Sequence, residues 1–150
     1  MTTLQMVIFG VVILGSLAGL WLGARNVKRK RRLPFQDRPD MSEEEFFVTY
    51  YRDAVIPKET ICHVLKVVAN ATEIPATKIR PSDRFDRELA PVRGWEFYDG
   101  LAEISWFAKS KMKKAGVREP TQLHTVDDLI RYVALLEIQK GKKRGSGLHP

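Results

Sequence analysis

Residues 94–115, GWEFYDGLAEISWFAKSKMKKA, form the longest amphipathic pattern of the chain outside its first segment. Apolar side chains recur there three or four positions apart, which is the period of an α-helix that packs one face against a core. Gly116 follows the pattern and is suited to the left-handed conformation that ends many helices. We therefore expect a central helix over residues 94–115, with Leu101 and Ile104 in the core.

Two further helices are expected to pack against this central helix. One begins at Pro57, where the missing N–H costs nothing, and is expected to bury Ile61, Val64, Leu65, Val68 and Ala71. The other follows Thr125 and is expected to bury Val126, Leu129, Ile130, Val133 and Leu136.

The remaining patterns complete an all-α domain. Ser42 and Glu45 form a capping box, which predicts a short helix over residues 43–53. Residues 72–93 contain three prolines and no sustained period, which predicts a long loop or a loop with one short turn. No segment alternates apolar and polar residues as a half-buried strand would, so the fold class is predicted to be all-α.

The positive charge of the chain is confined to its flanks. The 150 residues carry a formal net charge of +7, but residues 25–40 contribute +5 and residues 140–150 contribute +4. Residues 41–139 carry −2. The basic flanks have no stacking aromatic side chain beyond Phe35, which argues against specific nucleic-acid binding. A single cysteine excludes an intramolecular disulfide and a zinc site built on several thiolates.

The first 24 residues contain no charged side chain. Within them, residues 6–24 (MVIFGVVILGSLAGLWLGA) would form a helix of about 28 Å, close to the ~30 Å hydrocarbon layer of a bilayer. A basic cluster follows immediately and consists of Arg25, Lys28, Arg29, Lys30, Arg31 and Arg32. This arrangement predicts a single transmembrane helix with its N-terminus outside, the basic cluster at the membrane surface and the following domain in the cytoplasm.

Two alternatives stay open for this anchor. A cleaved signal peptide would use the small residues near Ser16, although its positive charge should precede the apolar run. Within the anchor, Gly15, Gly19 and Gly23 lie four residues apart on one helix face. This spacing lets two membrane helices approach closely and form a homodimer, or it reflects the general frequency of glycine in membrane helices.

The chain is therefore expected to have four parts. These are a transmembrane anchor over residues 1–24, a basic, proline-containing juxtamembrane linker over 25–42, a helical domain over 43–139 and a disordered basic tail over 140–150.

No group of residues has the pattern of a catalytic or metal site. Cys62 and His63 are adjacent on an expected helix and so do not face each other. In the long loop, three acidic residues alternate with three arginines. The acidic residues are Asp83, Asp86 and Glu88, and the arginines are Arg80, Arg84 and Arg87. This alternation predicts a solvated, salt-bridged loop. We expect no enzymatic activity, no cofactor and no metal ion.

Two local sequences resemble those of acyl carrier proteins. Residues 76–89, ATKIRPSDRFDREL, are similar to the loop of that family, and residues 125–133, TVDDLIRYV, are similar to its last helix. The resemblance covers residues 57–138 and implies a small helical bundle. Carrier proteins attach phosphopantetheine to a serine at the start of the central helix, whereas Gly94 stands at that position here. The resemblance therefore implies a degenerate carrier fold without the prosthetic group.

These observations favour a membrane-tethered, non-catalytic protein-interaction or scaffold module. The alternative is a membrane-bound acyl carrier protein that is modified at an atypical residue. The central helix is acidic in its first half and basic in its second. We expect it to bind a protein partner that matches this pattern of charge, and not the usual enzymes of carrier proteins. The alternative is that the charges only form a solvated helix face. The candidate partner-binding residues are Trp95, Glu96, Asp99, Glu103, Lys109 and Lys113.

Overall fold

The structure is a computed structural model that describes residues 16, 33–90, 100–117 and 122–145. The chain divides into two compact units, Met1–Gln36 and Asp37–Pro150. Among the described residues, no helix has the length and apolar character needed to cross a membrane. The predicted anchor (apart from the helical residue Ser16), its glycine face and the basic cluster at residues 25–32 lie outside the described residues.

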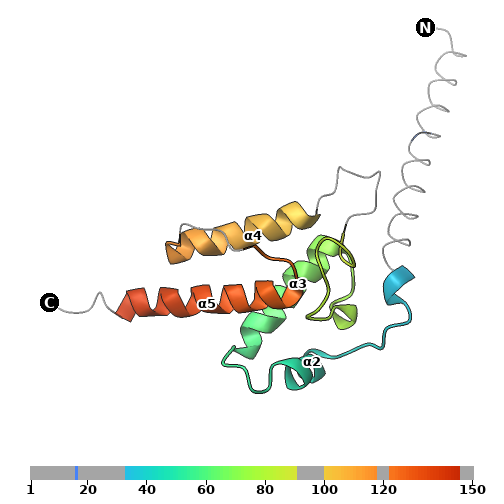
Figure 1. Ribbon diagram of the computed structural model, residues 1–150, viewed down its shortest axis with the longest axis horizontal. Coiled ribbons are helices and arrows are strands. Elements are labelled where there is room, and N and C mark those ends of the chain that lie inside the picture. The colour runs from blue at the N-terminus through green and yellow to red at the C-terminus, as the bar shows by residue number, and fades with distance from the viewer. Residues whose placement is uncertain (1–15, 17–32, 91–99, 118–121, 146–150) are drawn as a thin grey trace, which may run out of the picture. The chain divides into compact units, whose positions relative to one another are not determined.

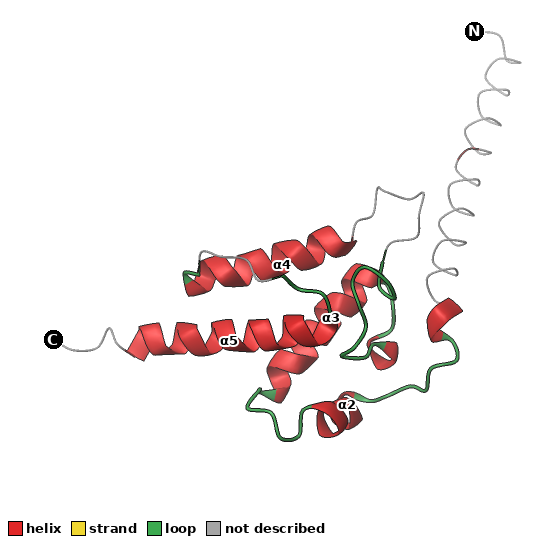
Figure 2. Cartoon of the chain, viewed as in Figure 1, coloured by secondary structure: helices red, strands yellow, loops and turns green. Residues whose placement is uncertain are grey.

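The described part of the chain is helical (Figures 1 and 2). A 3-10 turn, η1 (Leu33–Phe35), belongs to the first unit, and the second unit contains α2 (Glu43–Tyr50), α3 (Lys58–Thr72), the 3-10 turn η2 (Ala76–Lys78), α4 (Gly100–Ala115) and α5 (Val126–Gly145). Within the described ranges there is no strand, only one isolated bridge between Arg84 and Thr125. The all-α prediction is confirmed.

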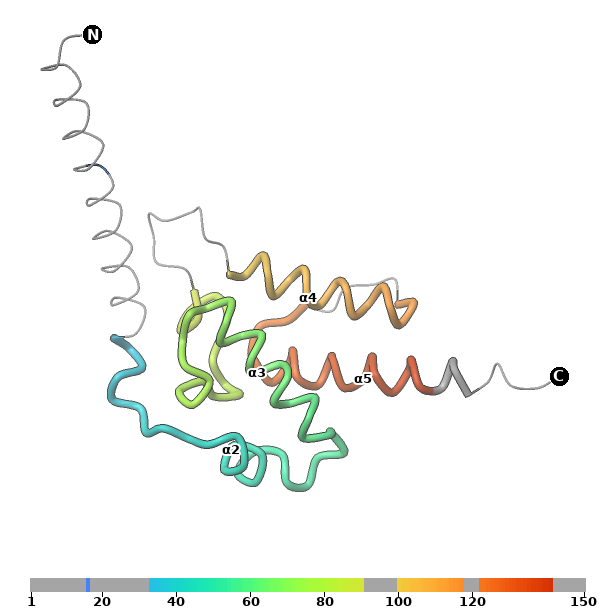
Figure 3. Tube along the Cα trace, turned by 180° about the vertical axis from the view of Figure 1, so that it is seen from behind, coloured from blue at the N-terminus to red at the C-terminus, as the bar shows by residue number. Residues whose placement is uncertain are grey.

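Helices α3, α4 and α5 form the core of the second unit. Helices α4 and α5 lie side by side and α3 crosses them, as both views show (Figures 1 and 3). Every residue predicted to face inward on α3 and α5 is buried. The sequence period was sufficient for these two helices because each buries a single continuous stripe.

Helix α2 begins at the predicted capping box but ends at Tyr50. The backbone N–H of Glu45 donates to Ser42 Oγ at 3.2 Å, and the N–H of Ser42 donates to Glu45 Oε2 at 2.7 Å. Tyr51 leaves the helical conformation, and its hydroxyl donates to Asp127 Oδ1 on α5 at 2.6 Å. The expected end at residue 53 is therefore wrong, because Tyr51 is buried against α5 instead of continuing the helix.

Helix α5 is also capped reciprocally. The N–H of Asp128 donates to Thr125 Oγ1 at 3.1 Å, and the N–H of Thr125 donates to Asp128 Oδ2 at 2.9 Å. Burial raises the pKa of Asp128, but the hydrogen bonds from Thr125 and His124 outweigh burial, and the net pKa is lowered. The helix then continues to Gly145, past residue 140, where the basic tail was expected to begin. Lysine and arginine are good helix formers, and cations are favourable near a helix C-terminus.

The segment before α2 is bound to the domain. The Arg38 guanidinium donates to both carboxylate oxygens of Asp83 at 2.8 Å. Nearby, the N–H of Met41 donates to the carbonyl of Thr77 at 3.0 Å, and the hydroxyl of Thr77 donates to Asp40 at 2.6 Å. Residues 38–41 were expected to belong to a linker, yet they are held on the loop that follows α3.

Asp83 corrects the prediction of a wholly solvated loop. Its side chain is only 1% exposed and also accepts a hydrogen bond from the N–H of Arg80 at 2.7 Å. Its backbone carbonyl accepts from the N–H of Val126 at 3.1 Å, which ties the loop to the start of α5. By contrast, Asp86 is exposed as predicted, and its hydrogen bond with Arg84 lowers its pKa to about 2.

A glycine determines the structure at each end of helix α4. A Cβ added to Gly100 would overlap the carbonyl group of Ala71, so only glycine permits this approach of α4 to α3. At the other end, Gly116 adopts a φ of 70°, and its N–H donates to Lys113 at 3.2 Å while the N–H of Val117 donates to Met112 at 3.2 Å. This is the Schellman pattern, which confirms the predicted glycine stop.

The buried face of α4 is shifted from the expected one. Its buried residues are Gly100, Ile104, Ala108, Met112 and Ala115, whereas Leu101 is only half-buried. Leu101 lies next to the centre of the stripe rather than on it. The prediction that Leu101 and Ile104 share one core is therefore correct for Ile104 and wrong for Leu101. Residues 94–99, which were expected to begin this helix, lie outside the described residues.

Candidate interaction surface

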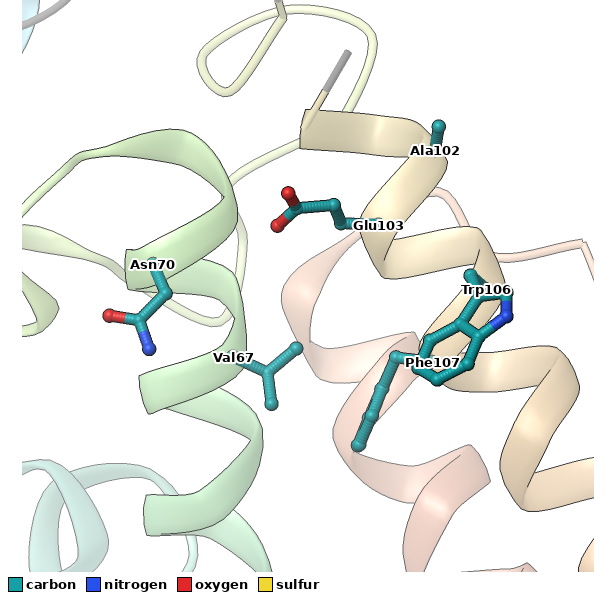
Figure 4. A pocket seen from close by; sticks show the side chains of 6 residues that line it. All are labelled: Val67, Asn70, Ala102, Glu103, Trp106 and Phe107. Atoms are coloured by element: carbon teal, nitrogen blue, oxygen red, sulfur yellow. The ribbon is translucent and has the colours of Figure 1, made fainter. Parts of the chain in front are cut away.

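An open groove lies between α3 and α4 (Figure 4). It has a volume of about 540 Å³ and is lined by Val67 and Asn70 of α3 and by Ala102, Glu103, Trp106 and Phe107 of α4. The two aromatic rings lie on α4, with Val67 across from them on α3, and the Glu103 carboxylate extends from α4 toward α3. An apolar centre with a few polar groups at its edge is a common composition for a binding site.

Trp106 is the most unusual residue of this groove because 73% of its surface is exposed. On α4 it lies opposite the stripe formed by Ile104, Ala108 and Met112. It therefore contributes little to the core of the domain. A large exposed aromatic side chain beside an apolar groove is typical of an interaction surface.

Phe107 is held in place by side chains on both sides. The His63 ring meets the Phe107 ring edge-on, with ring centroids 5.5 Å apart, and Lys111 Nζ lies 5.5 Å from the Phe107 centroid. Lys111 in turn donates to Glu137 Oε1 at 2.8 Å, and Thr60 donates to Glu137 Oε2 at 2.7 Å. One wall of the groove is therefore organised by contacts that join α3, α4 and α5.

The Glu137 carboxylate stays charged in this network. Burial raises its pKa, but hydrogen bonds from Lys111 and Thr60 outweigh burial and lower it. The charge of Lys111 is consequently engaged within the domain, and this lysine is not free to meet a partner.

Three of the predicted partner-binding residues lie on the exposed surface of α4. Glu103, Lys109 and Lys113 are exposed, and none of them pairs with an oppositely charged residue of the described ranges. The carboxylate of Glu103 lines the groove, whereas the two lysines follow beyond Trp106 along the helix. The other candidates, Trp95, Glu96 and Asp99, and the glycine at the carrier-serine position, Gly94, lie outside the described residues.

Sequence reasoning missed the residues that make the groove apolar. In the sequence, Trp106 and Phe107 are simply two more apolar residues of the pattern at residues 94–115, and they make its apolar stripe wider than one helix face. An apolar stripe wider than one buried face is itself a sign that part of it serves another surface. Val67 gave no such signal, because its position on α3 adjoins the buried stripe.

A second, charged pocket lies between the start of α2 and α3. It has a volume of about 440 Å³ and is lined by Glu43, Lys58, Glu59, Cys62, His63 and Lys66. Both of its lysines are paired with carboxylates, Lys66 with Glu43 at 3.2 Å and Lys58 with Glu44. Burial, together with a hydrogen bond to Glu43, raises the pKa of Cys62.

Cys62 does not have the lowered pKa of an activated, nucleophilic cysteine. The raised pKa keeps the Cys62 thiol protonated near neutral pH, and a thiol is a far weaker nucleophile than a thiolate. The His63 ring packs on Phe107 instead of meeting the thiol, as the sequence predicted for adjacent helical residues. Throughout the described ranges, no three His, Cys, Asp or Glu side chains gather in a way that could hold a metal ion.

Comparison with known proteins adds no relative. No family model matches the chain, and no significant match occurs among curated proteins or solved structures.

Proposed function

We propose that this chain is a membrane-tethered, non-catalytic interaction module whose partner site is the groove between α3 and α4. The observation that carries this proposal is the exposure of Trp106 beside Val67 and Phe107. Exposing a large aromatic ring next to an apolar groove forfeits the free energy of burying it, about 25 cal/mol for each Å² of apolar surface. A partner that covers the groove recovers this free energy.

The membrane attachment rests on the sequence of the first 32 residues. The apolar segment at residues 6–24 would span the bilayer, and the basic cluster at residues 25–32 would hold the interaction domain on the cytoplasmic side and contact anionic lipid. The glycine face of the anchor would support an anchor-mediated homodimer. Protease added outside intact cells should then leave residues 33–150 uncut, and degradation of that domain would contradict the orientation.

The similarity to acyl carrier proteins supports the non-catalytic part of the proposal. A carrier fold positions helices for docking to other proteins, and this chain has Gly94 where the attachment serine would stand. The alternative function is a membrane-bound carrier modified at another residue. Intact mass after incubation with coenzyme A and a phosphopantetheinyl transferase separates the two functions, because one added phosphopantetheine would support the carrier.

Site-specific crosslinking in native membranes tests the partner site directly. A photoreactive amino acid replaces Ala102 in the groove or, as the control, Val55, which is 92% exposed outside the groove. We expect a discrete protein adduct from position 102 and none of the same mass from position 55. In the Trp106→Ala background the adduct should be lost. Identical adducts from both positions, or adducts with lipid alone, would contradict a protein site in the groove.

A further inference from the structure

We infer that the occupant of the groove is a short amphipathic helix of a protein partner, with a basic residue at one end and acidic residues at the other. This inference rests on the proposed function and specifies the chemistry of its partner. An apolar groove between two helices accommodates the apolar side chains of a third helix at positions i, i+3 or i+4 and i+7. The apolar part of the groove, Val67, Trp106 and Phe107, provides that contact.

Three exposed charges on α4 that pair with no oppositely charged side chain of the described residues define the ends of the occupant. Glu103 lines the groove, and Lys109 and Lys113 follow it six and ten residues later along the same helix. At 1.5 Å per residue, the lysine positions lie about 9 and 15 Å along the axis from that of Glu103. A helix of about three turns that lies along α4 would therefore place a Lys or Arg near Glu103 and Asp or Glu side chains near the two lysines.

Glu103 also decides between a protein helix and a lipid surface. Trp106 with two neighbouring lysines is a combination that would suit anionic headgroups. However, Glu103 lies in the lining of the same groove, and its carboxylate would be repelled by an anionic surface. A helix that carries both signs of charge satisfies all three groups, whereas an anionic bilayer satisfies only the lysines.

Three synthetic helix-forming peptides of about 15 residues test this inference. All three have the same leucine stripe. The mixed-charge peptide carries lysines at one end and glutamates at the other. The second peptide carries lysines at both ends, and the third carries glutamates at both ends. Binding to the full chain in nanodiscs of zwitterionic lipid is followed by fluorescence anisotropy of the labelled peptide. Empty nanodiscs report adsorption of each peptide to lipid.

The wild-type chain should prefer the mixed-charge peptide by about two- to fivefold over either of the others, which is the range expected for exposed ion pairs. Glu103→Lys should reverse the order, so that the peptide with glutamates at both ends binds best. Trp106→Ala should weaken the mixed-charge peptide by at least about fivefold, and Val55→Ala should leave its binding unchanged.

Equal binding of the three peptides, no change of order with Glu103→Lys, or no saturable binding up to about 1 mM would overturn the inference. Binding of lipid in the groove is tested by the fluorescence of Trp106. The chain used for this measurement carries Trp21→Phe and Trp95→Phe, which leave Trp106 as its single tryptophan. A blue shift of Trp106 emission in anionic nanodiscs without peptide would identify a lipid surface and likewise overturn the inference. If a groove crosslink to a protein is found but the peptides are not distinguished, only the inferred partner chemistry fails and the proposed function stands.

Discussion

Replacing Arg38 by alanine tests whether the segment before α2 is part of the folded domain. In the structure, one terminal nitrogen of Arg38 lies 2.8 Å from both carboxylate oxygens of Asp83. Asp83 is 1% exposed, whereas the Arg38 side chain is 28% exposed. The substitution therefore leaves a buried carboxylate whose remaining donor is the N–H of Arg80.

The expected cost follows from this geometry. Removing one partner of a buried ion pair typically costs 3–5 kcal/mol (an order-of-magnitude range) because the other charge stays buried without compensation. Water can enter the space that the partly exposed Arg38 vacates, so we expect the lower end, about 3 kcal/mol. For a domain of this size, that loss should lower the melting temperature by about 10 °C. Adding Asp83→Asn to Arg38→Ala should restore about 1 kcal/mol, since a neutral amide costs less to bury than a carboxylate.

Urea unfolding of a soluble chain spanning residues 33–150 measures these differences. The control is Arg84→Ala, which removes an Arg–Asp pair of the same 2.8 Å length on the surface of the loop. That change should cost no more than about 1 kcal/mol. If Arg38→Ala costs as little as Arg84→Ala, the ion pair with Asp83 does not contribute to holding residues 38–41 on the domain.

Three further predictions concern single positions. Gly100→Ala should cost about 1–3 kcal/mol of stability, because the added Cβ would overlap α3. Gly141→Ala should stabilise α5 by up to about 1 kcal/mol, because a Cβ there meets no atom within 4 Å. Equal effects of the two substitutions in thermal melts would refute the close approach of α4 to α3 at Gly100. Glu73→Gly should raise the stability of the domain by about 0.5–1 kcal/mol, because Glu73 ends α3 with a φ of 58° that glycine adopts without strain. A lowered melting temperature of the Glu73→Gly variant would contradict this prediction. Ser42→Ala should cost about 1 kcal/mol at neutral pH. Hydrogen bonds from Ser42 lower the pKa of Glu45 below 4.5. The stability that these bonds contribute is therefore present above pH 4.5 and is lost as the pH falls through the folded-state pKa of Glu45. Urea unfolding at about pH 7 and about pH 3 should show a smaller effect of Ser42→Ala at the lower pH.

The features that the sequence predicted correctly are local. The capping box at Ser42, the start of α5 after Thr125 and the glycine stop at Gly116 each depend on residues within five positions of one another. The buried stripes of α3 and α5 follow from helical period alone. Such features are set by backbone hydrogen bonding and amphipathicity, which are encoded in short stretches of chain.

The features that the sequence did not predict involve distant residues. Arg38 and Asp83 are 45 positions apart, and neither differs in its local sequence from an exposed charge. The same holds for Tyr51, whose bond to Asp127 spans 76 positions and ends α2 early. A residue pattern gives the period of an element but not the partner that a particular side chain will meet, so these two buried contacts required the structure.

The candidate site was predicted in part for the same reason. The sequence identified the charges of the central helix, and Glu103, Lys109 and Lys113 are indeed exposed. The groove beside them is shared by α3 and α4, and no spacing within α4 reveals which residues of α3 line its other side. The exposure of Trp106 could be inferred only once Ile104, Ala108 and Met112 were known to form the opposite, buried face.

If residues 6–24 form the proposed membrane anchor, the docking of residues 38–41 also limits the length of chain between the anchor and the domain that carries the groove. If the anchor ends at Ala24 and the folded domain begins at Arg38, the 13 residues between them span less than their fully extended length of about 43–47 Å, because Leu33–Phe35 form a 3-10 turn. If the domain began at Glu43 instead, the maximum would rise by about 17 Å. A shorter tether confines the groove to a thinner layer beside the bilayer and raises its effective concentration toward a partner in the same membrane. A small groove that binds its partner weakly would then suffice, and Arg38→Ala should weaken capture of a membrane-bound partner even at temperatures where the domain stays folded.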